Sequence, residues 1–564
     1  MSKMSERYFS ATLPAALAAT LLMSSMFSGS AVAEPRGTLR IALQGFGVDT
    51  TAQWKGNTIN QVAYGDMYDN LIAANSKGQL TRDGIISDWK ASADGTSVVL
   101  TNRDGVTFHN GDPVSSEDIK FSIEMHMTGD GSMSGPALRG IIESMEVLNK
   151  NQIKVNLTSP VATFPNLLAC VEGDIAVIPK KYFESLPGAT VDEKTQAFMK
   201  APVYTGAFKF SKRKVGDFIE FEANRNYWDK AFQPDFEKIR ILNVKELSTR
   251  MNMLRTNEVD LVHVDSDGAM QMAKEGYPIF VTKSTSHDLL MFYESFNPEF
   301  LTHDIRFRKA LIFSVDRQAI KNAVFPEIPG LGRLGELTNG GPIHAPGVPG
   351  YDPDMPFYPY DPDAARRLLE EVGYYDNPQV ITAYSFTFAS FPEGPKYLEA
   401  IVAYWQQVGI KVKIEPVGYS VVHAKFLEHP NGFEPPAAVG VQSPSFRPSM
   451  LNNFRIFAVS DSGIKTEVEK ALGLEAGGYA SGMADLNKAD RLYLNAIQQM
   501  DPQMAEQAIR EIHKEGYEEY WGLPLGTRSV PFAARPGVIK EWSPVPLGSN
   551  CPRFYTARRG SQAN

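Results

Sequence analysis

Three glycines in the middle of the chain have the spacing of a dinucleotide-binding loop. Gly330, Gly332 and Gly335 match the pattern G-x-G-x-x-G letter for letter. That chemistry needs the glycines between a strand and the start of a helix, where backbone amides hold a pyrophosphate. Here the segment Phe325-Pro326-Glu327-Ile328-Pro329 precedes the motif, and a stretch rich in Gly and Pro follows it. We therefore interpret the three residues as loop glycines.

A serine and a lysine in the first quarter of the chain have the spacing found in acyl-serine enzymes. Ser87 and Lys90 fit the pattern S-x-x-K, in which a helical turn sets the amine against the hydroxyl. The next residues are Ala93-Asp94-Gly95-Thr96 and then Val98-Val99-Leu100, which predict a turn and a strand. Because a strand does not bring these side chains together, we interpret both as surface polar residues.

The histidines and cysteines do not form a metal-binding pattern. His423 and His429 are six positions apart, which fits neither a helical pair nor a strand pair, so we interpret them as solvated. The chain has nine His and two Cys, without zinc spacing. We find no set of nucleophile, base and orienting residue. The sequence therefore predicts a binding protein without metal or cofactor, not an enzyme.

Composition and charge narrow the class of protein further. The 564 residues include 56 Lys plus Arg and 65 Asp plus Glu, and 43% are hydrophobic. This balance excludes a disordered or collagen-like chain. A single core rarely extends beyond about 250 to 300 residues, so at least two lobes are expected. The net charge of −9 and the absence of a long basic run argue against nucleic-acid binding.

The N-terminus has the features of a removable secretory signal. Lys3 and Arg7 precede a largely apolar stretch over residues 11–26, and Ala31-Val32-Ala33 offers small residues for cleavage before Glu34. A membrane anchor is the alternative, but the apolar run is shorter than the roughly 20 residues that span a bilayer. Removal of residues 1–33 takes away two basic residues and one acidic residue, which leaves an acidic mature chain of net charge −10. We expect a periplasmic protein cleaved after Ala33.

The two cysteines leave the redox state open. Export permits a disulfide, and Cys170 and Cys551 are the candidates. Such a bond requires the C-terminal segment to return beside the first third of the chain. Two separate buried thiols are the other interpretation.

The hydrophobic pattern indicates α/β layering. Alternation predicts strands over residues 38–43, 153–157 and 410–415. A helix is predicted to begin after Ser115, where a hydroxyl precedes Asp118 by three residues, and further helices are predicted over 361–373 and 397–408. Between 325 and 362 the dense Pro and Gly predict an extended surface loop that wraps a lobe.

Several segments together resemble a known family. They follow one another in the same order as in the periplasmic solute-binding proteins of ABC importers in the peptide and nickel family (family 5). The matching segments are Asn102-Arg103-Asp104-Gly105-Val106-Thr107-Phe108-His109-Asn110-Gly111-Asp112-Pro113, Tyr204-Thr205-Gly206-Ala207-Phe208, Asn226-Tyr227-Trp228-Asp229, Glu258-Val259-Asp260-Leu261, and Asp304-Ile305-Arg306-Phe307-Arg308-Lys309-Ala310-Leu311 with Asp316-Arg317. The resemblance covers essentially the whole mature chain.

The resemblance implies a two-lobed α/β clamp, a type II periplasmic binding protein of the large cluster C kind, with a ligand cleft between the lobes. After the signal peptide at 1–33, it implies lobe I over 34–290, lobe II over 291–521, and a return segment at 522–564 that completes lobe I. Such receptors close around a small solute and deliver it to ABC permease subunits in the inner membrane. We expect a monomer.

One departure from the family pattern bears on the solute. In peptide-binding relatives, an aspartate after the "GIKV" strand pairs with the α-amino group of the ligand. Here the corresponding segment 437–457 contains no Asp or Glu. A buried ammonium there would lack a counter-charge, which is costly. We therefore favour a neutral or anionic solute, with Arg447 as a fork for a carboxylate or phosphate; Arg447 paired to a surface acid is the alternative.

The predicted ligand contacts are aromatic and amide residues near the presumed hinge, together with that arginine. They are Phe46, Trp54, Tyr204, Tyr293, Phe446, Arg447, Asn452 and Trp521. Core packing is the alternative role for each. Two other functions are also considered: a secreted serine hydrolase that uses Ser87 and Lys90, and a periplasmic chaperone or chemoreceptor partner on the same scaffold.

Overall fold

A computed structural model of the chain describes most of the mature sequence. The described residues are 34–443, 488, 491–492, 495–496, 499, 501–542 and 553–563, with gaps at 57, 75–78, 129–134, 163, 170–174, 283–286, 343, 347, 388–390 and 428–431. The signal segment 1–33, Cys170, Cys551, His429, Phe446, Arg447 and Asn452 lie outside the described residues. Within the ranges given above, no helix combines the length and apolar composition that crossing a bilayer requires.

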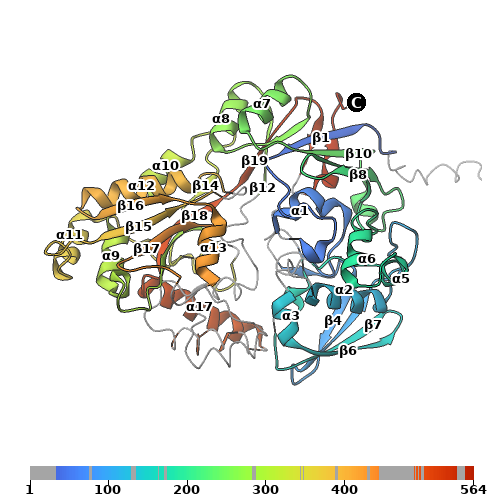
Figure 1. Ribbon diagram of the computed structural model, residues 1–564, viewed down its shortest axis with the longest axis horizontal. Coiled ribbons are helices and arrows are strands. Elements are labelled where there is room, and N and C mark those ends of the chain that lie inside the picture. Colours follow the sequence, from blue (N-terminus) through green and yellow to red (C-terminus); the bar gives the residue numbers. More distant parts are fainter. Residues whose placement is uncertain are drawn as a thin grey trace, which may run out of the picture.

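The chain forms two lobes, each built on a mixed β-sheet (Figure 1). The first sheet has seven strands in the order β12 (Ile279–Thr282), β19 (Val530–Ala534), β11 (Leu261–His263), β1 (Thr38–Leu43), β10 (Lys238–Asn243), β9 (Phe218–Ala223) and β8 (Phe208–Lys214). The second has six strands in the order β14 (Gly335–Glu336), β18 (Gly522–Arg528), β13 (His287–Tyr293), β17 (Ala438–Gln442), β15 (Val380–Ser385) and β16 (Lys411–Pro416). The expected two-lobed α/β fold is confirmed.

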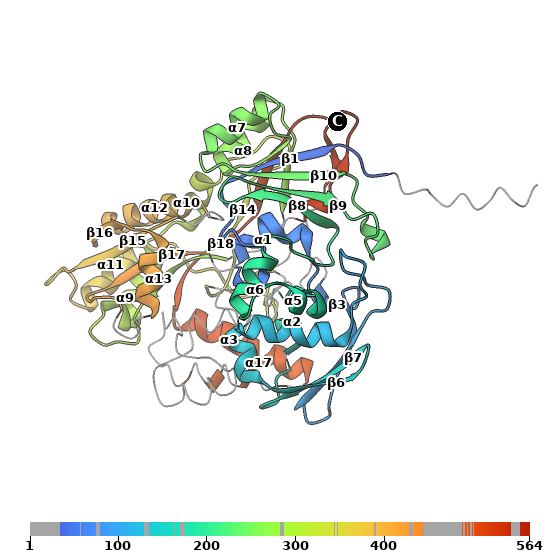
Figure 2. The same cartoon turned by 45° about the vertical axis from the view of Figure 1, so that its right-hand side comes forward.

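A smaller sheet extends the lobe of the seven-stranded sheet (Figure 2). Its four antiparallel strands are β4 (Ile86–Ala91), β5 (Ser97–Asn102), β7 (Gln152–Leu157) and β6 (Ile142–Asn149). The neighbouring helices are α1 (Thr58–Tyr64), α2 (Ser116–Thr128), α3 (Gly135–Ile141), α4 (Phe164–Leu167), α5 (Lys180–Ser185) and α6 (Val191–Phe198). Two short pairs, β2 (Ala73–Ala74) with β3 (Leu80–Thr81) and β20 (Ile539–Glu541) with β21 (Arg558–Arg559), complete the strands.

The other described helices lie between strands of the two larger sheets along the chain. They are α7 (Leu247–Arg255), α8 (Ser266–Lys274), α9 (Ile305–Phe313), α10 (Arg317–Val324), α11 (Pro362–Glu371), α12 (Gly394–Gln407), α13 (Tyr419–Leu427) and α17 (Pro502–Glu518). α7 and α8 belong with the seven-stranded sheet, since they lie between its strands β10, β11 and β12 along the chain. α11 and α12 likewise flank β15 of the six-stranded sheet.

The second half of strand β1 has both faces buried, since Ile41, Ala42 and Leu43 are at most 2% exposed. Leu39, Ile41 and Leu43 enter one apolar core, and Ala42 enters another. The core that contains Ala42 continues through α8 into the six-stranded sheet, where it includes Leu290 and the α12 residue Trp405. On this side, therefore, the two lobes share a single apolar core.

Along the strands that the structure describes, the chain passes from one large sheet to the other twice. β12 of the seven-stranded sheet ends at Thr282, and β13 of the six-stranded sheet begins at His287. The return runs from β18, which ends at Arg528, to β19, which begins at Val530. β18 itself pairs with β13 and β14 of the six-stranded sheet. The lobe boundaries at 290 and 521 remain a prediction from sequence.

The local signals of the sequence agree with the elements. The predicted strands correspond to β1, β7 and β16, and the predicted helices to α2, α11 and α12. Asp361 caps α11 by accepting a hydrogen bond from the Ala364 amide at 2.8 Å.

The long loop between α10 and α11 differs from the expectation of a surface loop. Much of it is buried: His344 has no exposed surface, and Asn339 is 5% exposed. The Asn339 amide donates hydrogen bonds to the carbonyls of Asp352, Pro353 and Met355 at 3.1, 3.0 and 2.7 Å. These bonds satisfy loop backbone groups that would otherwise need water, which allows the loop to pack inside the lobe.

Candidate functional site

The carboxyl ends of the parallel strands in both large sheets face the connections between the lobes. In the seven-stranded sheet, β11 ends at His263, opposite Phe532 near the start of β19. In the six-stranded sheet, β17 ends at Gln442, opposite Leu289 near the start of β13. Ligands of open α/β sheets bind beyond the carboxyl ends of the strands. The candidate site is therefore the region where these two edges meet.

An arginine and an aspartate from the two connections pair at this edge. Arg528 Nε lies 3.3 Å from Asp288 Oδ1, and the side chains are 5% and 0% exposed. The Ser443 hydroxyl, just after β17, donates to Asp288 Oδ1 at 2.7 Å and accepts from Arg528 Nη2 at 3.2 Å. Burial raises the pKa of Asp288 to about 6, although Arg528 opposes the shift. The cluster joins both connections to the end of β17.

Groups from both lobes surround the Arg528 guanidinium. It lies over the Phe391 ring, 4.6 Å from the ring centroid, which favours a cation–π contact. On the side of the seven-stranded sheet, burial lowers the pKa of His263 to about 3, and the charges of Arg250 and Arg528 add to this effect. His263 is therefore neutral at neutral pH, and Arg528 keeps Asp288 as its carboxylate partner.

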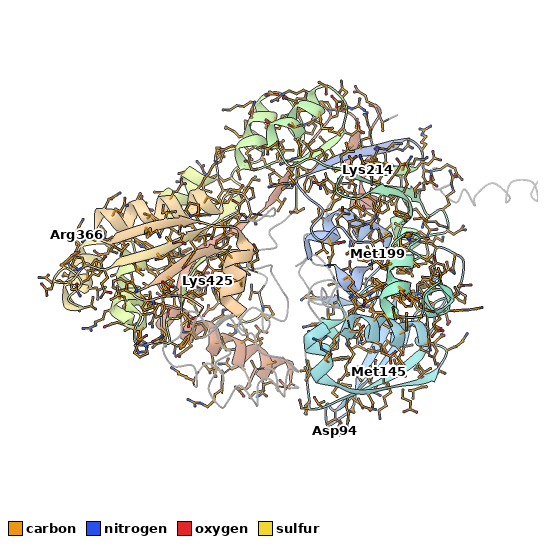
Figure 3. The ribbon with its side chains drawn as sticks, in the orientation of Figure 1. Asp94, Met145, Met199, Lys214, Arg366 and Lys425 are labelled. Carbon is orange, nitrogen blue, oxygen red and sulfur yellow. The ribbon has the colours of Figure 1, made fainter. Side chains whose placement is uncertain are left out.

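An aromatic cluster lies on one face of the six-stranded sheet. Tyr293, at the end of β13, is stacked on Phe433 with ring centroids 4.3 Å apart, and its hydroxyl accepts a hydrogen bond from the Gln442 amide at 3.0 Å. A Cβ on Gly440 of β17 would lie 2.3 Å from the Tyr293 hydroxyl oxygen, so the glycine makes room for the tyrosine. Lys425 of α13 lies 5.8 Å from the centroid of the Phe433 ring. Figure 3 shows Lys425 on the lobe opposite to that of Met199.

Three predicted contact residues on the other lobe lie in its apolar core. Phe46, Trp54 and Tyr204 are 2%, 1% and 0% exposed. The Tyr204 hydroxyl donates to the Thr51 carbonyl at 2.8 Å and accepts from the Gln53 amide at 3.1 Å. These bonds fix the loop that follows β1. A direct role in ligand binding remains a prediction for all three residues.

Of the remaining predicted contact residues, two are described in the structure and three are not. Trp521, 1% exposed, packs beside Gly516 of α17, directly before β18. Tyr293 belongs to the aromatic cluster above. Phe446, Arg447 and Asn452 lie outside the described residues. The structure thus brings Tyr293 and Gln442 together, whereas Trp54 and Tyr204 lie in the other lobe.

Asp288 and Arg528 were missed by the sequence analysis. Each is a charged residue at one end of an apolar strand, Asp288 just before Leu289 and Arg528 after Leu525. A charge at the end of a buried strand is a weak signal, because most such residues are solvated. Their partnership follows from the antiparallel pairing of β13 and β18.

The catalytic-looking motifs do not have the local structure that their chemistry needs. Ser87 and Lys90 both lie on strand β4, and the Ser87 hydroxyl donates to the Thr101 carbonyl at 3.3 Å. Gly330 and Gly332 have positive φ angles of 76° and 87° in a turn between α10 and β14, and the third glycine, Gly335, begins strand β14 and not a helix. Among the described residues, no three His, Cys, Asp or Glu side chains gather closely enough to hold a metal ion.

Two sheet-centred lobes joined by two connections are the fold of the two-lobed solute-binding proteins. The chain belongs to the bacterial extracellular solute-binding proteins, family 5, whose middle region matches residues 82–461.

Individual relatives have moderate similarity to this chain. Heme-binding protein A of Haemophilus influenzae is 27% identical over 376 residues, which cover 63% of this chain and 64% of the relative. The dipeptide-binding protein of Escherichia coli is 24% identical over 368 residues, or 62% and 65% of the two chains. The matched part therefore spans less than two thirds of the length of these relatives.

Solved structures support the fold over nearly the whole chain. The periplasmic binding protein DppA of Helicobacter pylori, in complex with the peptide STSA, superposes with a TM-score of 0.72 at 20% identity, covering 93% of this chain and 98% of that one. NikA of Brucella suis, in complex with Fe(III)-EDTA, also has a TM-score of 0.72 at 20% identity, covering 92% and 99%. At this level of identity the likeness concerns the fold.

Proposed function

We propose that this protein is the extracytoplasmic substrate-binding receptor of an ABC importer. It captures a small organic solute between its lobes and delivers it to permease subunits in the inner membrane. One observation carries this proposal: the carboxyl ends of the parallel strands in both sheets point to the two chain connections, beside the Arg528 and Asp288 pair. The family 5 membership of the chain agrees with it. Movement of the lobes about these connections would enclose the solute.

The proposed solute is neutral or anionic, and not a peptide held by a free amino terminus. The segment 437–457 has no Asp or Glu, and its described part, β17 with Ser443, offers amide and hydroxyl groups. Asp288, the acid beside it, already pairs with Arg528 and Ser443. Because these partners already engage the carboxylate, Asp288 is a poor counter-charge for a ligand ammonium. From sequence, Arg447 is the residue proposed to bind an anionic group of the solute through its guanidinium.

The location and partners form part of the same proposal. The sequence Ala31-Val32-Ala33 before Glu34 supports export to the periplasm with cleavage after Ala33. The receptor would act as a monomer that docks on its permease. The intact mass of the exported protein tests the cleavage position directly.

Mass spectrometry of small molecules that co-purify with the exported protein tests the receptor role. The expected result is one dominant organic solute, with loss of its uptake when the gene is deleted. Unchanged uptake of every solute that binds would contradict the importer role. Calorimetry then tests the solute class by comparing a dipeptide with its N-acetylated form. Tight binding of the free dipeptide alone would contradict the solute class and leave the receptor role intact.

A further inference from the structure

Two helices from different lobes meet at their first turns. α8 follows β11 of the seven-stranded sheet, and α12 follows β15 of the six-stranded sheet. Glu393, directly before α12, is 5% exposed. Its Oε1 accepts hydrogen bonds from the Ser266 amide at 3.3 Å and from the Ser266 hydroxyl at 3.0 Å. A carboxylate of one lobe thus satisfies an N-terminal amide of a helix in the other lobe.

The first turns of the two helices make a second contact, in which the acidic residue belongs to α8 and its partner to α12. The Lys396 ammonium of α12 pairs with the Asp267 carboxylate of α8. Both side chains are about half exposed, at 51% and 52%, so water and salt screen this pair. The buried Glu393 contact is therefore the stronger of the two, and the Lys396 pair adds a second fixed point to the same interface.

Only one oxygen of the Glu393 carboxylate, Oε1, accepts hydrogen bonds from the described residues. In the part of the chain that the structure describes, its Oε2 has no hydrogen-bond partner. The charge of Glu393 also reaches the Asp288 and Arg528 pair, since it contributes to the raised pKa of Asp288. A small rotation of one lobe would move Ser266 away from Oε1 and lengthen both of its hydrogen bonds. The contact is therefore sensitive to the angle between the lobes.

The contact lies where the lobes share an apolar core. Ala269 and Met272 of α8 and Leu398 of α12 all belong to that core and are at most 1% exposed. Figure 1 shows α8 near α10 and α12, on the side away from α17 and α3. Apolar packing is non-directional and tolerates rotation, whereas the Glu393 bonds depend on geometry.

We propose that Glu393 is a positioning residue that fixes the angle between the two lobes by capping α8 from the opposite lobe. The contact forms in the arrangement of this structure and breaks when the lobes rotate. It therefore biases the equilibrium between lobe arrangements by the difference in its strength between them.

Distance measurement between spin labels on the two lobes tests this proposal. Lys90→Cys on β4 and Arg367→Cys on α11 place labels at exposed positions, in a background where Cys170 and Cys551 are replaced by Ser. In the full-length mature protein, Glu393→Ala should shift or broaden the distribution of distances between the labels. Hydrogen exchange at the Ser266 amide should become about tenfold faster, because the amide loses its acceptor.

Two further variants separate positioning from general stability. Glu193→Ala removes a carboxylate that accepts from the Ala189 and Thr190 amides at the start of α6, within one lobe. This control should leave the distance distribution unchanged. Ser266→Ala removes only the hydroxyl donor, so it should alter the distribution in the same direction as Glu393→Ala, by less. If Glu393→Ala unfolds the protein, Ser266→Ala decides the question. A distribution identical to wild type in the folded variants would overturn the proposal.

Discussion

Arg528 and Asp288 join the two chain connections between the lobes, with Arg528 Nε 3.3 Å from Asp288 Oδ1. Their positions differ by 240 in the sequence, so the pair forms only when β13 and β18 are correctly paired. Both side chains are buried, and Ser443 completes the cluster. The strand connections therefore have a fixed electrostatic arrangement at the point where lobe movement would be centred.

The buried carboxyl of Asp288 predicts a specific pH dependence. Its pKa is about 6 in the fold and about 3.8 when unfolded, so the native state binds the extra proton between these values. Relative to Asp288→Asn, the wild type should lose about 2 kcal/mol of stability as pH rises from 4 to 7. Urea unfolding at several pH values measures the difference. Asp94→Asn, at an exposed turn, should show no such trend over this range, and a pH-independent difference for Asp288→Asn would contradict the prediction.

Replacement of Gly440 should disturb Tyr293. The new Cβ would lie 2.3 Å from the Tyr293 hydroxyl oxygen, and Tyr293 is held by Phe433 and Gln442. We expect Gly440→Ala to destabilise the protein by about 1 to 3 kcal/mol. Adding Tyr293→Phe should recover part of the loss, because the clashing oxygen is removed. Gly418→Ala, where the nearest atom lies at 3.6 Å, is the matched control for denaturant midpoints. Equal midpoints for both alanine variants would show that Tyr293 moves freely.

Arg447 should determine affinity for an anionic solute. This prediction comes from sequence, since the residue lies outside the described part of the chain. Arg447→Ala should weaken an anionic ligand by about 1.5 to 3 kcal/mol, roughly ten- to hundred-fold, through loss of two parallel hydrogen bonds. Arg447→Lys should recover part of the affinity. Calorimetry on the mature protein measures both, and an unchanged affinity for Arg447→Ala would refute the assignment.

Acid should destabilise the fold through its buried histidines. Burial lowers the pKa of His513 to about 3, with an added effect from the charge of His344. Since an unfolded histidine has a pKa near 6.5, the unfolded state binds more protons between pH 6.5 and 3. Relative to His513→Gln, the wild type should lose up to about 1.4 kcal/mol per pH unit below pH 6.5. Thermal or urea unfolding at pH 7.5, 5.5 and 4.5 checks this, and parallel stability curves would exclude it.

The elements that sequence analysis predicted well are those with local signals. Asp361 and Pro362 start α11 as a cap and first residue, and the alternation of Lys411, Val412 and Lys413 indicates β16 because side chains on a strand point to alternate faces. Such signals involve residues that are close in sequence. The fold class followed from their order along the chain and from the family resemblance.

The candidate site could not be predicted from local sequence patterns, because it is formed by contacts between residues far apart in the sequence. The partnership of Asp288 with Arg528, and of Glu393 with Ser266, requires that distant strands and helices be in register. The same holds for the loop between α10 and α11, whose Gly and Pro content predicted exposure, whereas Asn339 and His344 anchor it inside. Aromatic composition selected Tyr293 as a candidate, but it cannot separate a ligand contact from core packing, so the ligand role of Tyr293 remains a prediction.

The position of β19 has a consequence for folding during synthesis. β19 lies between β11 and β12 in the seven-stranded sheet, yet it is the last strand of that sheet in the chain. Its residues, Val530–Ala534, are synthesised more than 240 positions after β12 ends at Thr282. Until they emerge, the first lobe cannot close its sheet, because pairing over such sequence separations forms late. A nascent chain would therefore leave β12 without its strand partner, and the first lobe incompletely folded, until nearly its whole length has been made.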